Sequence, residues 1–426
     1  MSYRKIGDLI QLVDVRNKDL SITPLVGLTI NKKFIPSVAN TIGSDMSKYK
    51  IIRKNQFACS TMQVRRDKKM PVALLKDFKI AIISQAYPVF EVLDENEILP
   101  EYLMLWFTRS EFDREACFHA VGGVRGSLEW EDFCNMELPI PSIEKQQKIV
   151  AQYQAVENKI KVNEQICEKL EAAAQTLYRQ WFVDFEFPVS DIEALEVPDG
   201  LASTSLSHQS KESVAERSRG YKSSGGKMVF NEELEKEIPE GWEVMSFTET
   251  VKLTGGGTPR TDVHEYWNGN IPFFTPADIQ KSYYSIDTIK SITKLGLKES
   301  STKLYPKDTV FITARGTVGA IGLSSRNMAM NQSCYAINNN LPYYIHQKTL
   351  DVIEKLKGEA VGAVFSALVT KDFDQQIVLE PTESIKEDFN NAIKYIYDLL
   401  LSKSKENKKL TQLQSLLLSR LARLEG

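Results

Sequence analysis

No stretch of the sequence is apolar enough to span a membrane, because a bilayer-crossing helix needs about 20 consecutive apolar residues. The first residues, Met1 to Lys5, lead into no apolar signal core, so we expect neither membrane insertion nor export. Cysteine is scarce as well. The five cysteines are scattered, odd in number and without a Cys-x-x-Cys pair. This pattern is typical of reduced thiols in the cytoplasm and argues against disulfides and a zinc site.

Catalytic signatures are also missing. The four histidines lie far apart and show no metal-ligand spacing. The Walker A, His-Glu-x-x-His and Gly-x-Ser-x-Gly motifs are absent. We therefore predict that the chain carries no catalytic residue, no metal and no cofactor of its own. A net charge of only −3 does not point to a nucleic-acid ligand, but it excludes none, because DNA responds to a local patch of charge.

What the sequence does contain is enough for two or three domains with full-sized cores. It has 426 residues, of which 42% are hydrophobic and 26% charged, as in ordinary globular proteins. Short β-like runs such as Tyr49–Ile52 and Ile80–Ile83 mix with helical patterns, for example from Pro100 to about Ala116. These patterns predict a mixed α/β (α+β) fold.

One long helix organises this chain. From Ile149 to Trp181, the residues spaced alternately four and three apart include a single strongly polar side chain, that of Asn163. Such a seam, kept over five heptads, predicts a helix from Ser142 to about Phe182 that packs along another helix. About 40 residues at about 1.5 Å each make a rod roughly 60 Å long. The aromatic residues from Trp181 to Phe187 are expected to pin its end to a globular surface.

The second half of the chain repeats the first. Residues 120–133 match residues 360–373 at a constant offset of 240. Weaker matches follow the same order, which makes them significant together. They pair Asn55–Thr61 with Asp308–Ala314, Ser84–Ala86 with Asn331–Ser333, and Leu99–Tyr102 with Leu341–Tyr344.

The repeat also supplies the partner of the long helix. Ser384 and Glu387 have capping-box spacing, and a second seam runs from Ile393 to Leu424. Its middle is polar, at Lys403 and Asn407. In an antiparallel pair, Asn163 and Asn407 meet near the centre and fix the register of the two helices. The alternative is that these are two unrelated exposed polar positions.

These patterns predict two similar mixed α/β domains, separated by two long antiparallel helices that form an intramolecular coiled coil with pseudo-twofold symmetry. Residues from 190 to 228 are rich in Ser, Glu, Lys and Gly and poor in aromatics, which is typical of a linker that is mobile in part. The expected boundaries are residues 1–141 for the first domain, 142–187 for the first helix, 188–237 for the linker, 238–382 for the second domain and 383–426 for the second helix.

One motif favours catalysis. Asn340–Tyr343 resembles the Asn-Leu-Pro-Tyr signature of amino-methyltransferases, so a catalytic DNA adenine methyltransferase is the alternative function. Such an enzyme needs a glycine-rich turn that leads into a helix, and Gly255–Gly257 is followed by Pro259 instead. We therefore interpret Leu341-Pro342 as the start of a helix, with proline in its first turn.

Basic and amide side chains gather in short loops in both halves. They are the donors that bind phosphates and base edges in DNA. In the first half the candidates are Gln63, Arg65, Arg66, Lys68, Lys69, Arg125 and Ser127. In the second half they are Thr258, Arg260, Arg315, Thr317, Asn331 and Gln332.

Each loop alone is equally compatible with an ordinary solvated turn. Arginine-bearing loops in both repeats together favour a polyanion as the ligand. A purely structural coiled-coil scaffold is a third possible function, but it leaves these paired loops unexplained.

These residues resemble the specificity subunit of type I restriction-modification enzymes, and the resemblance covers nearly the whole chain. It rests on stretches such as Ala86–Val92, Leu138–Gln146, Gly256–Pro259 and Ala314–Gly319. The chain departs from the family pattern where the second long helix begins, at Glu380–Ser384. Residues 190–219 look like an insertion, and the usual Leu-x-x-Gly close is missing.

The resemblance implies two target-recognition domains, each reading one half of a split double-stranded DNA sequence. It implies a non-catalytic subunit, with two methylation subunits that bind the helices and bring S-adenosylmethionine. Restriction subunits driven by ATP, with Mg²⁺, complete the nuclease. Exposed Lys, Gln and Glu on the first helix are the expected docking face, and the length of this helix is expected to help set the separation of the two DNA readers.

Overall fold

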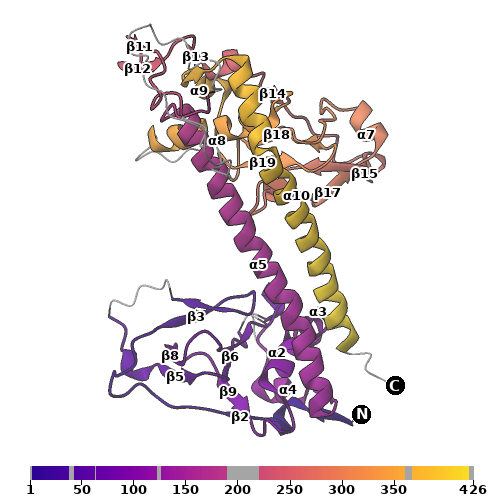
Figure 1. Cartoon of the computed structure of the whole chain (residues 1–426). Coiled ribbons are helices and arrows are strands. Elements are labelled where there is room, and N and C mark those ends of the chain that lie inside the picture. Colours follow the sequence, from indigo (N-terminus) through magenta and orange to yellow (C-terminus); the bar gives the residue numbers. More distant parts are fainter. Residues whose placement is uncertain are drawn as a thin grey trace, which may run out of the picture. The chain divides into compact units, whose positions relative to one another are not determined.

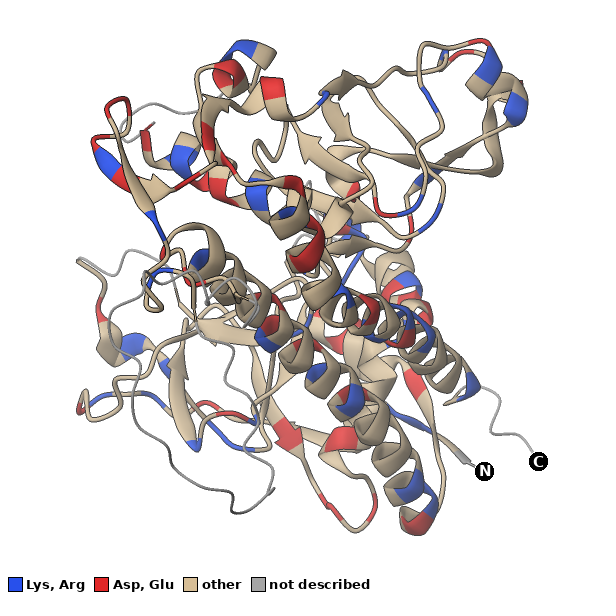
Figure 2. Ribbon diagram, turned by 45° about the horizontal axis from the view of Figure 1, so that its top comes forward, with Lys and Arg blue, Asp and Glu red and all other residues tan. Residues whose placement is uncertain are grey.

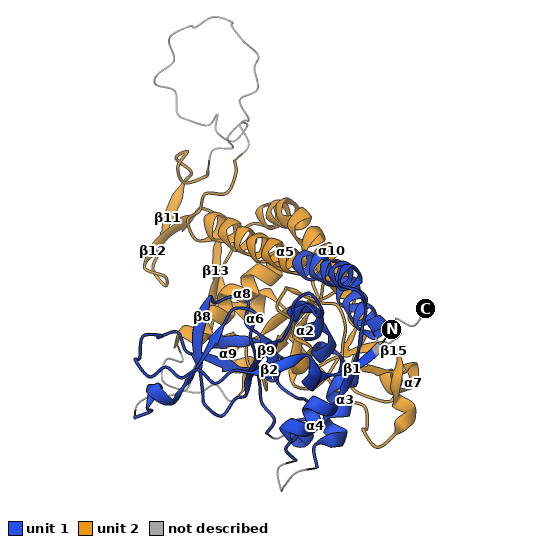
Figure 3. Ribbon diagram, turned by 90° about the horizontal axis from the view of Figure 1, so that it is seen from below, with its two compact units in different colours: residues 1–160, 409–426 blue, residues 161–408 orange. Residues whose placement is uncertain are grey.

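The computed structural model describes residues 2–37, 43–62, 64–121, 126–189, 220–359 and 367–421. The chain divides into two compact units, formed by residues 1–160 with 409–426 and by residues 161–408 (Figure 3). Two long helices, α5 (Ile143–Phe182) and α10 (Glu383–Arg420), contribute to both units (Figure 1). Over the described ranges, no helix combines the length and apolar character that crossing a membrane requires.

The first unit is built on an antiparallel sheet with the strand order β2-β9-β6-β7. Its strands are β1 (Ser2–Lys5), β2 (Ile10–Leu12), β3 (Val26–Leu28), β4 (Phe34–Pro36), β5 (Lys50–Arg53), β6 (Phe57–Cys59), β7 (Val72–Leu74), β8 (Ile80–Ile83), β9 (Val89–Val92) and β10 (Glu137–Ile140). Its shorter helices are α1 (Val64–Asp67), α2 (Pro100–Thr108), α3 (Ser110–His119) and α4 (Trp130–Asn135). The predicted strands around residues 50 and 80 are β5 and β8, which pair with each other.

Aromatic packing fills the core of this unit. All three residues of β6 are buried, as expected for a central strand with both faces covered. The Phe57 ring stacks on Phe90, and Phe107 meets both rings edge-on. The single helix predicted from Pro100 to Ala116 is wrong, because Arg109 has an extended backbone and divides it into α2 and α3. The buried Arg109 guanidinium lies 4.0 Å from the centre of the Trp106 ring, a contact between residues that periodicity does not reveal.

The second unit contains a five-stranded sheet, β14-β21-β18-β19-β16, and a three-stranded sheet, β17-β15-β20. Its strands are β11 (Met228–Asn231), β12 (Lys236–Pro239), β13 (Glu243–Ser246), β14 (Thr254–Gly255), β15 (Trp267–Phe274), β16 (Tyr284–Ser285), β17 (Lys290–Ile292), β18 (Val310–Thr313), β19 (Ile321–Ser324), β20 (Ala329–Met330), β21 (Cys334–Ile337) and β22 (Ile377–Glu380). Its shorter helices are α6 (Phe247–Thr250), α7 (Lys294–Lys298), α8 (Pro342–Glu359) and α9 (Thr370–Asp374). The β11–β12 hairpin lies at the end of the predicted linker, whose residues 190–219 are outside the described ranges.

The internal repeat is confirmed by the order of the elements. A short helix, a strand and a long helix follow one another as α4, β10 and α5 in the first unit and as α9, β22 and α10 in the second. Strand β22 and helix α10 each begin 240 positions after their counterparts β10 and α5. The antiparallel order β2-β9-β6-β7 recurs as β14-β21-β18-β19.

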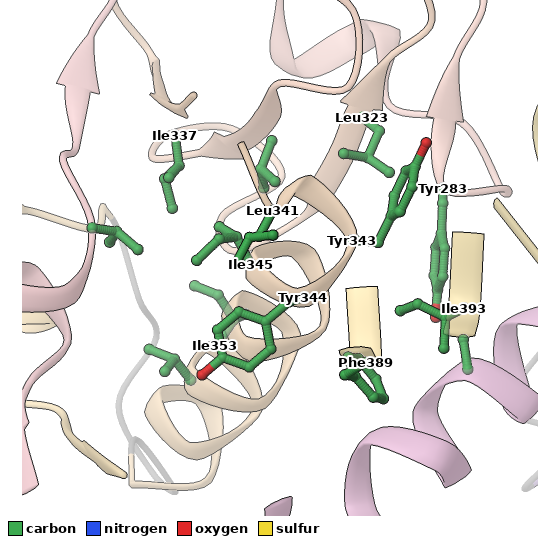
Figure 4. Close-up of a cluster of buried hydrophobic side chains, with 14 of the residues drawn as sticks. Tyr283, Leu323, Ile337, Leu341, Tyr343, Tyr344, Ile345, Ile353, Phe389 and Ile393 are labelled. Carbon is green, nitrogen blue, oxygen red and sulfur yellow. The ribbon is translucent and has the colours of Figure 1, made fainter. Parts of the chain in front are cut away.

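The end of α5 is buried in the core of the second unit, as the run of aromatic residues predicts. Phe182 packs against Phe389 of α10, with ring centres 4.9 Å apart, and against Tyr344 of α8. Figure 4 shows Tyr344 and Phe389 within this cluster, together with Ile345 and Ile393. Burying one such aromatic or aliphatic side chain contributes roughly 1.5–3 kcal/mol.

The two long helices pair in antiparallel fashion. In the second unit, Asn163 Nδ2 donates a hydrogen bond of 2.8 Å to Asn407 Oδ1, so the two asparagines meet in the seam. Every residue of the α5 seam is buried or half-buried. In the first unit, the opposite ends of the same helices line a pocket of about 190 Å³ with Ile149, Tyr153, Leu417 and Leu421.

The two long helices start at equivalent positions of the repeat. The carbonyl of Ser142 accepts the first hydrogen bond of α5, from the Gln146 N–H, so the helix starts at Ser142 as predicted and Ser142 is its cap. Helix α10 begins two residues earlier than a capping box with Ser384 as its cap predicts. The carbonyl of Thr382 accepts from the Lys386 N–H, so the cap is Thr382 rather than Ser384.

A buried histidine, His346 of α8, packs against Tyr397 of α10. His346 Nδ1 is 2.8 Å from the Tyr397 hydroxyl, which also accepts a hydrogen bond from Gln347 Nε2. Its ring centre is 4.5 Å from that of Tyr283. Burial of the imidazole lowers its pKa from an ordinary value near 6.5 to about 3. The folded protein therefore holds His346 neutral.

The asparagine pair predicts a stability effect. Asn163→Ala removes the hydrogen bond to Asn407 Oδ1 within the seam and should lower the local stability of the helix pair by about 1–3 kcal/mol. Replacing both asparagines by leucine should raise it, because the buried polar pair is exchanged for apolar packing. Hydrogen exchange of the α5 amides around residue 163 measures both effects. Equal protection in the wild type and Asn163→Ala would contradict the importance of this bond.

His346 makes stability depend on pH. The unfolded chain binds a proton at this residue below about pH 6.5, whereas the folded protein does so only near pH 3. Its contribution to the free energy of unfolding should therefore be lost as the pH falls from 6.5 toward 3, by up to ~1.4 kcal/mol per pH unit. His346→Gln should flatten this slope in urea unfolding at pH 7, 6 and 5. Identical slopes for the variant and the wild type would refute the assignment.

Candidate nucleic-acid interface

In the second unit, the candidate residues gather at one edge of the five-stranded sheet. Neighbouring strands from β14 to β19 are antiparallel, so the loops that follow β14 and β18 lie at the same edge as the loop that precedes β21. These three loops carry all six candidates of this unit: Thr258, Arg260, Arg315, Thr317, Asn331 and Gln332. The topology thus brings together residues that are up to 74 positions apart in the chain.

Backbone and side-chain contacts tie these three loops to one another. The Thr258 hydroxyl donates a hydrogen bond to Gln332 Oε1, and the N–H groups of Ala314 and Arg315 donate to the carbonyl of Ser333. Gly256 permits this approach, since a Cβ there would lie 2.0 Å from the Asn331 oxygen. The Asn331 side chain accepts from the Ser333 N–H at 3.1 Å, so this amide holds the loop. The edge is a preformed surface of three connected loops.

The two arginines of this edge have different surroundings. Arg260 forms two hydrogen bonds to Asp262, of 3.3 Å from Nε and 2.7 Å from Nη2. This contact raises the pKa of Arg260 and lowers that of Asp262, so both remain charged. Arg315 is exposed, and no carboxylate of the described residues lies within ion-pair distance of it. Thr317 is exposed beside it, and its carbonyl accepts from the Thr313 hydroxyl.

In the first unit, the basic loop joins β6 to β7. Val64 and Met70 are fully buried and anchor its two sides, while the four cations between them, Arg65, Arg66, Lys68 and Lys69, are exposed. The Met70 N–H donates to Asp113 of α3 at 3.0 Å. Arg66 forms an ion pair of 2.7 Å with Asp67. The loop therefore carries four exposed cations on a backbone that is anchored at both sides.

The glycine-containing turn of the first unit lies directly against this loop. The Arg65 N–H donates to the Gly126 carbonyl, and the Leu128 N–H donates to the Thr61 carbonyl. Gly126 has φ +61°, and a Cβ at this position would lie 2.5 Å from the Cβ of Arg65. Ser127 is half-buried in the turn. Two of the candidates, Gln63 and Arg125, lie outside the described residues.

Sequence reasoning missed one arginine at the corresponding edge of the first unit. Arg16 follows β2 as Arg260 follows β14, and β2 and β14 occupy equivalent places in the two sheets. Its Nε lies 2.8 Å from Asp14, and its Nη1 donates to the Lys48 carbonyl at 2.8 Å. Lys50 Nζ lies 3.9 Å from the same aspartate. Extending the repeat alignment upstream to β2 would have identified this position.

The methyltransferase-like motif is a helix start. Pro342 is the first residue of α8, and the N–H of Tyr343 donates to Asn390 Oδ1 of α10 at 3.0 Å. The Tyr343 ring is buried and stacks on Tyr397, with ring centres 4.4 Å apart (Figure 4 shows Tyr343 in the cluster). A ring that fills the core cannot stack on a substrate base. The helix interpretation of the motif is therefore correct.

Comparisons with known proteins agree with the repeat. The model of the type I restriction modification DNA specificity domain matches residues 3–172 and 239–412. The specificity subunit of the type I restriction enzyme HindI from Haemophilus influenzae is 26% identical over 98% of this chain and 97% of its own length. The MjaIX specificity subunit from Methanocaldococcus jannaschii is 28% identical over 40% of this chain and 41% of its own.

A solved structure has the same fold. The S subunit of a type I restriction-modification system from M. genitalium superposes with a TM-score of 0.53. Its sequence is 14% identical to this one, and the match covers 99% of this chain and 96% of that protein. Two mixed α/β units with two long helices, as predicted, are thus a known architecture.

A substitution at Gly126 tests whether the turn that packs against the loop between β6 and β7 requires a glycine. Gly126→Ala places a side chain in the left-handed region and against Arg65, so we expect the free energy of unfolding to fall by about 1–3 kcal/mol. Urea unfolding measures this loss, and hydrogen exchange at the Arg65 amide shows whether the loop contact opens. Gly255→Ala is the matched control, because an added Cβ there meets nothing within 4 Å. A variant as stable as the control would show that the loop does not need this glycine.

Proposed function

Because the chain belongs to the family of type I restriction modification DNA specificity domains and carries two copies of the domain, we propose that it is the DNA sequence-recognition subunit of a type I restriction-modification complex. It binds a split, asymmetric double-stranded DNA site, and each unit reads one half of it. The same edge of the repeated sheet supports this assignment, since it presents donor-bearing loops in both units.

The two edges are related but not identical, which fits an asymmetric site. The first unit presents four exposed cations in the loop after β6, whereas the second presents Arg315 in the equivalent loop after β18. Cations of this kind bind phosphates and guanine edges, and amides such as Gln332 bind adenine. Since the side chains differ from one edge to the other, the two units are suited to different half-sites.

The subunit itself is non-catalytic in this proposal. The buried Tyr343 argues against a methyltransferase site at residues 340–343. Methylation then requires two partner subunits that bring S-adenosylmethionine, and restriction requires ATP-driven subunits with Mg²⁺. The complex works in the cytoplasm, where reduced thiols such as the buried Cys59 and Cys334 persist.

The long helices are the proposed docking elements for the methylation subunits. Both of them carry Lys and Arg as well as Asp and Glu (Figure 2). The seam side chains are covered by the partner helix, so polar residues such as Lys148, Gln152 and Glu157 form the exposed face of α5. A charged face with both signs favours a specific polar partner surface over nonspecific association.

The test maps methylated positions in DNA from cells that carry the complete complex. A bipartite motif should appear with this subunit and vanish without it. Exchanging residues 1–141 for another domain of the family should change only one half of the motif. A change in both halves would contradict modular recognition, and the absence of any motif would contradict the function.

Arg315 tests the edge itself. Arg315→Ala should weaken DNA binding by the complex for all sequences alike and lower the salt dependence of the binding constant by about one phosphate contact. Arg326→Ala is the matched control, because Arg326 follows the opposite end of β19 and pairs with Asp287 at 3.7 Å. Equal effects of the two substitutions would favour a scaffold role for this unit over DNA contact at its edge.

A further inference from the structure

The pair formed by Arg260 and Asp262 has a geometry that stability does not explain. Both side chains are well exposed, at 73% and 64%, and such surface pairs contribute little to folding. The carboxylate takes the Nε edge of the guanidinium through two hydrogen bonds. Its effect is therefore to fix the direction in which the rest of the guanidinium points.

The backbone at Arg260 is fixed as well. The Trp267 indole N–H donates to the Arg260 carbonyl at 3.0 Å, and Lys290 lies over the Trp267 ring at 5.6 Å. Two residues earlier, Thr258 is bound to Gln332. The arginine is held on both sides, which limits the conformational entropy that it would lose on binding a ligand.

The remaining edge of the guanidinium, formed by Nη1 and Nη2, has no acceptor among the described residues. Two parallel N–H groups match the O6 and N7 acceptors of guanine in the major groove. Phosphate is a poorer fit, because Asp262 cancels the positive charge of Arg260 and repels a phosphate oxygen.

Two other arginines differ from Arg260 in the groups that their guanidinium contacts. Arg315, at the same edge, keeps its full positive charge and suits phosphate. Arg16 occupies the equivalent place in the first unit and has the same kind of aspartate partner, but its Nη1 is already bonded to the Lys48 carbonyl. Because hydrogen bonds occupy both sides of the Arg16 guanidinium, this arginine holds its own loop. It has no free pair of parallel N–H groups for a base.

We propose that Arg260, oriented by Asp262, reads a guanine in the half-site of the second unit, while Arg315 grips a phosphate. This inference rests on the proposed function and assigns base reading and backbone grip to two different residues of one edge. It predicts that the half-site that is unaffected by exchange of residues 1–141 contains a G·C pair recognised through Arg260.

The experiment compares Arg260→Lys with Arg315→Lys in the complete complex. Both variants keep the positive charge but lose the two parallel N–H groups of the guanidinium. Binding is measured to the natural duplex and to duplexes in which each base pair of that half-site is substituted in turn. Arg260→Lys should lower discrimination at one G·C pair by about 5- to 150-fold, the equivalent of ~1–3 kcal/mol. Arg315→Lys should leave discrimination at every position within about twofold.

Asp262→Asn supplies a second readout that a merely structural role would not produce. It frees the charge of Arg260, so binding to unrelated DNA should rise while discrimination at the same G·C pair falls. Thermal unfolding of each variant alone shows whether it is folded.

Three results would overturn the inference. They are a half-site without a G·C pair, unchanged discrimination in Arg260→Lys, and an equal loss of binding to all sequences in both lysine variants. If the wild-type complex shows no sequence preference, the proposed function fails with it. A preference that survives Arg260→Lys removes only the inference.

Discussion

The antiparallel pairing of α5 and α10 is the contact on which each unit depends. In the second unit, Trp181 and Phe182 from the end of α5 enclose Phe389 from the start of α10, and the sheet packs around them. In the first unit, Val150 and Leu421 from the other ends of these helices join the core. The chain therefore completes neither core until both long helices are in place. Asn163 and Asn407 favour one register of this pairing, because a shift would break the hydrogen bond between their buried amides.

The internal repeat gives the chain two sheets with the same strand order. In a sheet of antiparallel strands, every second loop lies at the same edge, so residues that are distant in sequence become neighbours. In both units this edge lies where the central strand ends, at Cys59 of β6 and Thr313 of β18. The core can stay alike in both units while the loops differ, since substitutions at the edge leave the buried strands unchanged.

Much of this arrangement could be predicted from sequence, because it depends on periodicity and repetition. The seam residues, the Asn163–Asn407 contact and the equivalence of the two sheets all follow from patterns that span many residues. What periodicity missed depends on single contacts. The break at Arg109 comes from packing on Trp106, and the cap of α10 is Thr382, two residues before Ser384. Arg16 was missed because its hydrogen-bond partner, the Lys48 carbonyl, lies 32 residues away, and only an alignment of the two repeats relates it to Arg260.

The modest net charge of the chain follows from how its cations are used. Arg66 and Arg260 are each paired with a nearby aspartate, and the long helices carry both signs of charge (Figure 2). A carboxylate beside an arginine reduces attraction to any polyanion but keeps the direction of the guanidinium fixed. Binding strength that is spread over phosphates favours all DNA equally, whereas oriented donors favour one base pair. In the proposed function, a recognition subunit can therefore carry little net charge, because its selectivity would depend on the few donors that are held in place at each edge.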